Sequence, residues 1–518
     1  MRRSSSHEKT ITWPWRGRVA VLALSLALLA QVALPNAAQA GPVGGLIRLS
    51  QMGPNGNPDY GPEPFEAFPV TNTVAVAFSP DTSTYLAVWA SDSAPGLGVD
   101  EREIWGQRLD ANGNALGGDF RISQMGQDGL ADYRAFWPAV TYNTKAHEFL
   151  VVWEAVDQVP GAIAPNEWEI YGQRISASGA QVGADDFRIS QMGPKNNPAF
   201  DATSPSVTYN SGLNEYLVVW EGDTYNLWKT NGEYEVYAQR ISAAGSEIGG
   251  DRQISEVGKP LDTSFLAGAP DVAYNPDQGE YLVVFHADDN ANGLVNDEFE
   301  VLGQRLSAKG SNVGSQIGAD DFRISHMGPD VNSLYEGERP GVAYDPVNRR
   351  YLVVWEGDHH QGGVVKGDTE VWGQGLDKSG ALLGPMTRLS QMGAAGDTWV
   401  DVFSTDVAFQ PSVGSFLVTW SGTEVGKPYH DDFMEDWMAE YEVYVQETKV
   451  GSQGATETGA DDAMVSHMGP DGDTLYDGFV PSVTAGSGQE FFLAWAGDHN
   501  SGGVVEGEFE AWGQRWKK

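Results

Sequence analysis

Short apolar runs recur along the chain, separated by longer polar stretches. Each run resembles Tyr351 to Trp355, and its last aromatic residue returns at intervals of 64 to 75 residues. A strand that is apolar at nearly every position is typical of one covered on both faces. A repeat of this length indicates supersecondary units that bury their apolar faces against each other. The seven aromatic residues are Trp89, Trp153, Trp220, Phe285, Trp355, Trp420 and Trp495.

Each unit carries three further strand patterns. In the fifth unit they are 340–344, 370–374 and 387–390, all rich in Val, Leu or aromatic residues and bounded by Gly, Pro, Asn or Asp. The last pattern belongs to a phrase of the form Ile/Leu-Ser-x-Met-Gly, and no stretch after residue 40 shows a sustained helical period. We therefore predict units of four antiparallel strands. The serine recurs at Ser50, Ser123, Ser190, Ser255, Ser325, Ser390 and Ser466.

The two ends of the chain complement each other. Residues 46–50 form a fourth strand with no unit before it, whereas the last unit stops after its third strand, 510–515. Pairing these segments would close a ring and cover both strand edges. We predict an all-β fold, a seven-bladed β-propeller of four-stranded antiparallel blades closed by the N-terminal strand. The blades are expected at about 71–123, 135–190, 203–255, 268–325, 338–390, 403–466 and 479–516.

The repeated phrases resemble the β-propeller-like repeats of large bacterial secreted proteins and surface proteins of the RTX type. Val353-Val354-Trp355, Tyr171-Gly172-Gln173-Arg174 and Asp110-Ala111-Asn112-Gly113 carry the resemblance, which extends over all seven units. It implies an extracellular role rather than a named activity. The chain has no sialidase-type Asp-box, no Gly-His…Trp-Asp pattern and no glycine-rich RTX nonapeptide. The functions tied to those motifs are therefore not expected.

Residues 1–40 have the layout of a secretory signal peptide. A basic leader precedes the apolar run 19–34, and Ala38-Gln39-Ala40 is a small-residue cleavage site. The run of about 16 residues is shorter than the roughly 20 that span a membrane; an uncleaved anchor is the alternative. We expect a secreted monomer, extracellular or periplasmic, with residues 41–518 forming the propeller. Attachment to the cell surface is left open.

Acidic residues dominate the composition. The chain has 32 basic and 71 acidic residues, and 27 and 70 without the leader, which gives a net charge of −43. Such a surface repels nucleic acid and anionic membranes, so we expect neither as a partner. It suits cations or basic partners, or it merely keeps a sheet-rich protein soluble. Because cysteine is absent, burial and sheet pairing must stabilise the fold.

Every unit begins its third strand with two acidic residues at positions i and i+2. These positions point to the same side of a strand, so each pair needs a cation or a basic group beside it. The arginine after the aromatic-Gly phrase, such as Arg174 or Arg305, is the expected partner. Alternatively, one acid faces water and the other caps a neighbouring blade. The pairs are Glu101/Glu103, Glu167/Glu169, Glu233/Glu235, Glu298/Glu300, Asp368/Glu370, Glu440/Glu442 and Glu508/Glu510.

The loops after Met-Gly carry oxygen-bearing side chains at spacings of about two and six residues. Ca²⁺ takes six to eight such oxygens in flexible geometry, although Asn and Asp are also ordinary turn residues. We predict Ca²⁺ sites in several blades, with the third-strand acids as further partners. The candidate ligands are Asp128, Asp132, Asp330, Asn332, Glu336, Asp397, Asp401, Asp471, Asp473 and Asp477, together with Asp368, Glu370, Glu508 and Glu510.

The repetition also bears on function. Sevenfold uniformity favours a non-catalytic binding module that presents its acidic loops to a glycan or to an extracellular or cell-surface protein. Tyr225, Trp228 and Trp437 lie on irregular loops and are the candidate ligand contacts. The alternative is a secreted hydrolase acting on polysaccharide, with carboxylates drawn from the same kind of loop. Its candidate catalytic residues are Asp431, Asp432 and Glu435.

Overall fold

The strand patterns of the sequence correspond to 28 β-strands, which form seven four-stranded antiparallel sheets. The computed structural model describes residues 40–52, 55, 74–92, 101–156, 167–193, 199–223, 232–259, 263–310, 312–359, 365–394, 396, 398, 400–423, 440–470, 476–499, 504 and 507–518. Within these residues the one helix is a 3₁₀ turn, η1 (Asn290–Asn292). No helix in this part of the chain is long and apolar enough to cross a membrane.

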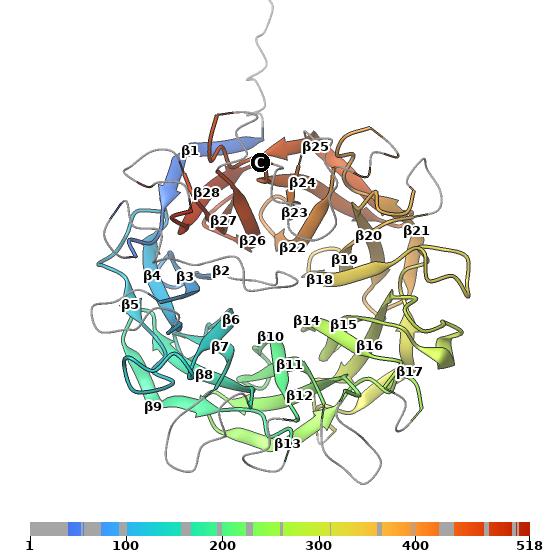
Figure 1. Ribbon diagram of the computed structural model, residues 1–518, viewed down its shortest axis with the longest axis horizontal. Coiled ribbons are helices and arrows are strands. Elements are labelled where there is room, and N and C mark those ends of the chain that lie inside the picture. Colours follow the sequence, from blue (N-terminus) through green and yellow to red (C-terminus); the bar gives the residue numbers. More distant parts are fainter. Residues whose placement is uncertain are drawn as a thin grey trace, which may run out of the picture. The chain divides into compact units, whose positions relative to one another are not determined.

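The sheets follow one another in chain order around a ring (Figure 1), and the predicted seven-bladed propeller is confirmed. Blade 1 contains β2 (Val74–Ser79), β3 (Thr84–Ser91), β4 (Glu103–Asp110) and β5 (Phe120–Arg121); blade 2 contains β6 (Ala135–Asn143), β7 (Glu148–Ala155), β8 (Glu169–Ser176) and β9 (Gln181–Arg188). Blade 3 contains β10 (Ala202–Asn210), β11 (Glu215–Gly222), β12 (Glu235–Ser242) and β13 (Glu247–Gln253); blade 4 contains β14 (Ala267–Asn275), β15 (Glu280–Ala287), β16 (Glu300–Ser307) and β17 (Gln316–Arg323).

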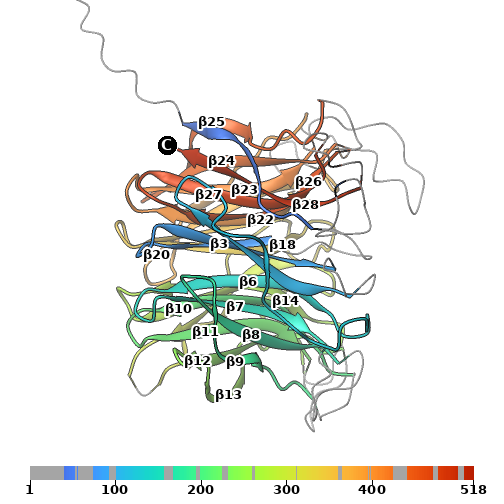
Figure 2. The ribbon, with the colours of Figure 1, turned by 90° about the vertical axis from the view of Figure 1, so that its left-hand side faces the viewer.

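The remaining blades have the same order of strands. Blade 5 contains β18 (Gly337–Asp345), β19 (Arg350–Gly357), β20 (Glu370–Asp377) and β21 (Leu382–Arg388); blade 6 contains β22 (Val402–Gln410), β23 (Ser415–Gly422), β24 (Glu442–Gly451) and β25 (Gly454–Met464). Blade 7 contains β26 (Gly478–Ala485), β27 (Glu490–Gly497), β28 (Glu510–Lys517) and β1 (Gly41–Arg48). Figure 2 shows the strands running between the two faces of the ring.

The N-terminal strand completes blade 7. β1 pairs antiparallel with β28, so that Arg48 lies opposite Trp512. Just after β1, the Ser50 hydroxyl donates a hydrogen bond to Glu510, and the backbone N–H of Met52 donates to the same carboxylate at 3.2 Å. Met52 itself is buried. The predicted closure is therefore present, although the strand begins at Gly41 rather than at residue 46.

The second strands form the core between the blades. All six tryptophans that end these strands are fully buried. In four blades the indole N–H donates to the sulfur of a methionine from the Met-Gly loop that precedes the blade, as Trp220 does to Met192 at 3.2 Å. The tryptophans and the methionines are thus core residues, as the repeat predicts.

The first strands contact one another around the axis of the ring. In β6, β10, β14, β18, β22 and β26 the register against the second strand shifts, which marks a β-bulge. Proline follows the bulge residue in five of these six strands; because proline has no N–H to give a neighbouring strand, it suits an edge strand. The bulge residues have positive φ: Trp137 (49°), Ser204 (53°), Ala269 (45°), Arg339 (47°), Ser404 (57°) and Val480 (54°).

Candidate functional site: the axial cavity

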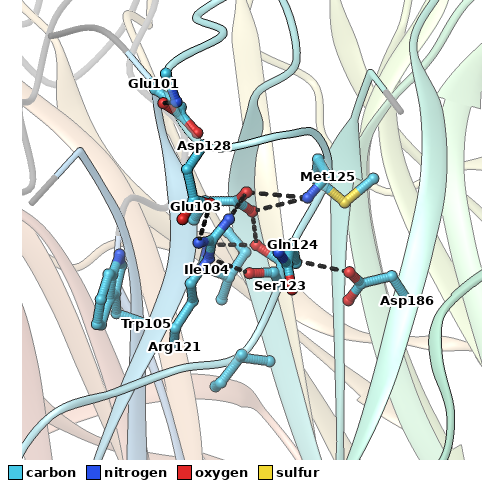
Figure 3. Close-up of polar contacts among 12 residues, drawn as sticks. Glu101, Glu103, Ile104, Trp105, Arg121, Ser123, Gln124, Met125, Asp128 and Asp186 are labelled. Carbon is cyan, nitrogen blue, oxygen red and sulfur yellow. Dashed lines mark hydrogen bonds and ion pairs between the residues drawn. The ribbon is translucent and has the colours of Figure 1, made fainter. Parts of the chain in front are cut away.

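The repeated third-strand acids are structural. In blade 1 the buried Glu103 carboxylate accepts hydrogen bonds from Arg121, from the Ser123 hydroxyl and, at 2.9 Å, from the Met125 N–H (Figure 3). The Ser123 hydroxyl in turn accepts from the Ile104 N–H at 2.7 Å. In every blade the same serine of the Ile/Leu-Ser-x-Met-Gly phrase donates to the second acid of the pair. The acid therefore ties the third strand to the start of the Met-Gly loop.

The prediction of the arginine partner is wrong. Arg174 pairs with Glu148 at 2.7 and 2.9 Å, and Arg305 pairs with Glu280. Arg174 lies five positions beyond Glu169, so the two side chains point to opposite faces of β8. The guanidinium that contacts Glu169 comes instead from Arg188, at the end of β9.

In six of the seven pairs the first acid is also buried, and in blade 6 the first acid, Glu440, is half-buried. Glu298 accepts the N–H of Val331 at 3.1 Å, and Asp368 accepts the N–H of Gly396 at 2.7 Å. These acids cap the Met-Gly loop of their own repeat, since backbone N–H groups are good donors to a carboxylate. The alternative in which one acid of each pair faces water is therefore wrong for six of the seven pairs.

The predicted calcium ligands do not converge in the described part of the chain, where no group of three or more His, Asp or Glu residues could hold a metal ion. Asp128 and Asp330 each form an ion pair at 2.8 Å, with Arg121 and Arg323. The remaining loop candidates are separate: Asp477 accepts the N–H of Tyr441, Asn332 accepts that of Leu334, Glu336 and Asp401 are half-buried and Asp132 is exposed. Glu370, Glu508 and Glu510 are buried third-strand acids. Asp397, Asp471 and Asp473 lie outside the described residues, and calcium stays a prediction.

The irregular-loop candidates fall outside the part of the chain that the structure describes. This applies to the predicted ligand contacts Tyr225, Trp228 and Trp437, and to the predicted catalytic residues Asp431, Asp432 and Glu435.

A cavity of about 700 Å³ lies where the first strands meet, and part of its volume is open solvent. It is lined by bulge residues of blades 2 to 6 and by residues that follow them. A second cavity shares Trp137, Ser204, Ala269 and Arg339 with it. Among the lining residues are two carboxylates, Asp271 of β14 and Asp406 of β22. They lie on the first strands to either side of β18, whose Gly341 lines the same cavity.

Asp271 and Asp406 occupy the same place in their blades. One residue on each first strand pairs with the second-strand residue that comes just before the recurring aromatic. This position is described in all seven blades, and two of its seven residues are acidic. The other five are small. The position is held by Ala75, Ala139, Ser206, Asp271, Gly341, Asp406 and Ser482.

The two carboxylates are held by neighbouring first strands. Asp271 accepts the Ser206 hydroxyl at 2.7 Å and the Val342 N–H at 2.8 Å, while Asp406 accepts the Val483 N–H at 2.8 Å. Burial, with a smaller contribution from the charge of Asp271, raises the pKa of Asp406 to about 7 against the opposing hydrogen bonds. Burial also raises the pKa of Asp271. A pair of carboxyl groups of this kind supplies one proton donor and one base near neutral pH.

The strained bulges beside this pair are fixed from the preceding blade. Glu221 accepts the N–H of Ala269 at 2.7 Å, and Glu154 accepts that of Ser204 at 2.9 Å. In blade 5 the acceptor for the bulge residue Arg339 is His286, whose Nδ1 lies 3.2 Å from the Arg339 nitrogen. The Arg339 guanidinium itself is paired with Glu356. The cavity wall is therefore held in place by buried polar contacts between blades.

Sequence reasoning missed the axial residues, although two signals pointed to them. A proline inside a strand indicates an edge strand or a bulge, and Pro205, Pro270 and Pro340 recur in the first strands. An acidic residue follows the proline in blade 4, where other blades have Ala, Ser or Gly. Departures of this kind from a repeat are the places where a unique site can lie.

No model of a known protein family matches the chain, and no curated protein matches its sequence. Solved structures similar to it include the α-L-arabinanase of Penicillium chrysogenum with arabinobiose, with 12% identity, coverage of 74% of this chain and 93% of that chain, and a TM-score of 0.41. An α-L-arabinofuranosidase from Fusarium graminearum, with an iminosugar inhibitor, has 12% identity, coverage of 74% and 93%, and a TM-score of 0.40. The sialidase of Trypanosoma rangeli has 8% identity, coverage of 91% and 60%, and a TM-score of 0.42.

The predicted non-catalytic binding module is wrong by these comparisons, because the matched structures are those of carbohydrate-active enzymes. That prediction is withdrawn. Likeness at this level assigns no activity to this chain, so the case for a function rests on the axial cavity.

Proposed function

We propose that this protein is an exported hydrolase that cleaves glycosidic bonds of a polysaccharide in its axial cavity. The observation that carries the proposal is the pair Asp271 and Asp406, two carboxyl groups with raised pKa that line one cavity. Glycoside hydrolysis needs two carboxyl groups that flank one bond, one protonated and one ionised. The predicted alternative of a polysaccharide hydrolase is thereby kept, with its catalytic residues moved from the irregular loops to the cavity.

The roles follow from the surroundings of each group. Asp406, with a pKa of about 7, is the proton donor: it protonates the glycosidic oxygen as the bond from that oxygen to the anomeric carbon breaks. Asp271 is the base that takes a proton from the water that attacks the same carbon. One water is consumed, and each fragment of the polysaccharide ends in a hydroxyl group.

The test begins with the exported chain on arabinan, xylan, galactan and β-glucan, with released sugars separated by anion-exchange chromatography. Asp271→Asn and Asp406→Asn should each lower kcat about 10²- to 10⁴-fold, the usual contribution of a general acid or base. In each variant the amide oxygen still accepts the N–H of the next blade, and in Asp271→Asn the amide NH₂ can donate to the Ser206 oxygen. In Asp406→Asn the Val407 N–H loses its acceptor, so a small fall in melting temperature is expected there.

Asp462→Asn is the matched control. Asp462 also has a pKa raised to about 7 and accepts an N–H from the adjacent blade, that of Gln391 at 2.7 Å, but it lies on the outer strand β25. Its replacement should leave kcat unchanged. Failure of all four polysaccharides to be cleaved, or full activity in Asp406→Asn, would overturn the proposal.

A further inference from the structure

Two large side chains stand at the bulge position of the first strands. Ser204, Ala269 and Ser404 are small there, whereas blade 2 has Trp137 and blade 5 has Arg339. Trp137 and Arg339 line both parts of the axial cavity. The indole of Trp137 is half-buried and so reaches the free space of the cavity.

The backbone at Trp137 is strained. Its φ of 49° lies in the left-handed region, which a bulky residue rarely adopts and which glycine adopts without penalty. The same conformation occurs at the five equivalent bulges with Ser, Ala, Arg or Val, so the fold does not require tryptophan there. The strain therefore belongs to the bulge itself, and what is particular to blade 2 is the aromatic side chain that lines the cavity there.

We propose that Trp137 is a positioning residue that stacks on a sugar ring of the substrate inside the axial cavity. An aromatic face offers an apolar platform, and the carbon-bound hydrogens of one sugar face match it. Asp271, Asp406 and Arg339 line the same cavity and provide polar partners for the hydroxyl groups. The ligand class is therefore a neutral sugar ring with one apolar face, and the inference rests on the proposed function.

The position of Trp137 along its strand supports this role. One part of the cavity includes Ala267, the first residue of β14, while the other part includes Asp271, four residues further on. At about 3.3 Å per residue, and with one residue taken up by the bulge, the two lie roughly 10 Å apart along the axis. Trp137 lines both parts, as do Ser204, Ala269 and Arg339, and it is the aromatic residue among these four. A sugar ring stacked on the indole would therefore lie in the same cavity as the carboxyl pair.

The experiment measures binding separately from cleavage. The Asp406→Asn chain is titrated calorimetrically with xylotetraose, cellotetraose, arabinotetraose and galactotetraose. The titrations are then repeated with the double variants that add Trp137→Ala or Trp137→Phe to Asp406→Asn. The alanine variant should raise the Kd for the tetrasaccharide that binds by at least tenfold. The phenylalanine variant should raise it by less than threefold. Trp105→Ala, which removes a half-buried tryptophan from the third strand β4, is the matched control and should leave the Kd unchanged.

Stability separates positioning from folding. Trp137→Gly relieves the left-handed conformation, so its melting temperature should equal or exceed that of the parent chain while binding is lost. A marked fall in melting temperature would make the indole structural and overturn the inference, as would an unchanged Kd in Trp137→Ala or no binding by any of the four tetrasaccharides. If the parent chain binds a tetrasaccharide through Trp137 but never cleaves it, the hydrolase proposal falls and the stacking site stands.

Discussion

Glu169 and Asp406 are both carboxyl groups whose pKa burial raises to about 7, yet their surroundings differ. Glu169 lies on the third strand β8, where Arg188, the Ser190 hydroxyl and the Met192 N–H all donate to it. Asp406 lies on the first strand β22 and lines a cavity. A raised pKa alone therefore does not distinguish a structural acid from a reactive one.

Repetition distinguishes them. The contact between serine and acid recurs in every blade, as expected for a group that stabilises each repeat. Acidic residues at the axial position occur in two blades only. In a repeat protein, a feature shared by every unit reports how the fold is held, and a feature confined to one or two units reports where a unique site lies.

The largest effect is expected at the ring closure. Removing residues 41–52 from the exported chain deletes β1. It also leaves Glu510 without the hydrogen bonds donated by the Ser50 hydroxyl and the Met52 N–H. Blade 7 then has three strands and an uncovered edge, so we expect a sharp fall in melting temperature and a tendency to aggregate. Circular dichroism melts and gel filtration, with the chain beginning at residue 41 as the control, check this. A melting temperature equal to that of the control would contradict the closure.

Removing one structural acid should have the next largest effect. Glu169→Ala leaves a guanidinium, a hydroxyl and an N–H without their acceptor, which should lower the free energy of unfolding by about 3 kcal/mol. Urea denaturation measures it. Asp271→Asn is the comparison, with an expected change of less than about 1 kcal/mol, since the amide keeps an acceptor oxygen. Equal losses in the two variants would abolish the distinction between third-strand and axial acids.

The raised pKa values also predict how stability depends on pH. Burial raises the pKa of Asp321 to about 8 and that of Asp462 to about 7. Between the unfolded value near 4 and these values the folded chain holds more protons than the unfolded chain, so stability falls as pH rises. The melting temperature should therefore decrease from pH 6.5 to pH 9, a window in which the lowered pKa values of His286 and His326 have little effect.

The control for this effect is the double variant Asp321→Asn and Asp462→Asn. It removes two of the groups that titrate in the window, so its melting temperature should change less with pH than that of the parent chain. Melts in EDTA keep bound cations from contributing. A melting temperature that rises with pH in the parent chain would show that the ionised forms are the stable ones.

The sequence predicted the fold because the apolar period repeats through all seven units. The apolar runs likewise predicted that strands such as the one ending at Trp220 are covered on both faces, and Trp220 is buried in contact with Met192. The prediction for Arg174 was wrong. Arg174 was chosen as the partner of Glu169 because it is near along the chain, but it lies an odd number of positions away, so its side chain is on the other face of the strand and pairs with Glu148. Spacing along a strand predicts which face a side chain lies on only when odd and even separations are distinguished.

The axial site escaped prediction for a different physical reason. The first strand of blade 5 was expected to start at Pro340, whereas β18 starts at Gly337 and contains a bulge at Arg339. A bulge inserts one extra residue, so beyond it the positions that would have faced one side of the sheet face the other side. Without the bulge, the side of the strand that faces the axis cannot be assigned, and Asp271 and Asp406 look like ordinary strand residues.

The smallest effect is expected for calcium. In extracellular modules Ca²⁺ is held with a Kd of about 10⁻⁴ to 10⁻³ M, so millimolar calcium would add roughly 1 kcal/mol per site. The gain is limited because Asp330 already pairs with Arg323, and Glu370 already accepts from Ser390 and the Met392 N–H. Melts in 5 mM CaCl₂ and in EDTA should differ by a few degrees, and Asp477→Asn should reduce that difference. Identical melts would mean that these acids serve folding and solubility without a metal ion.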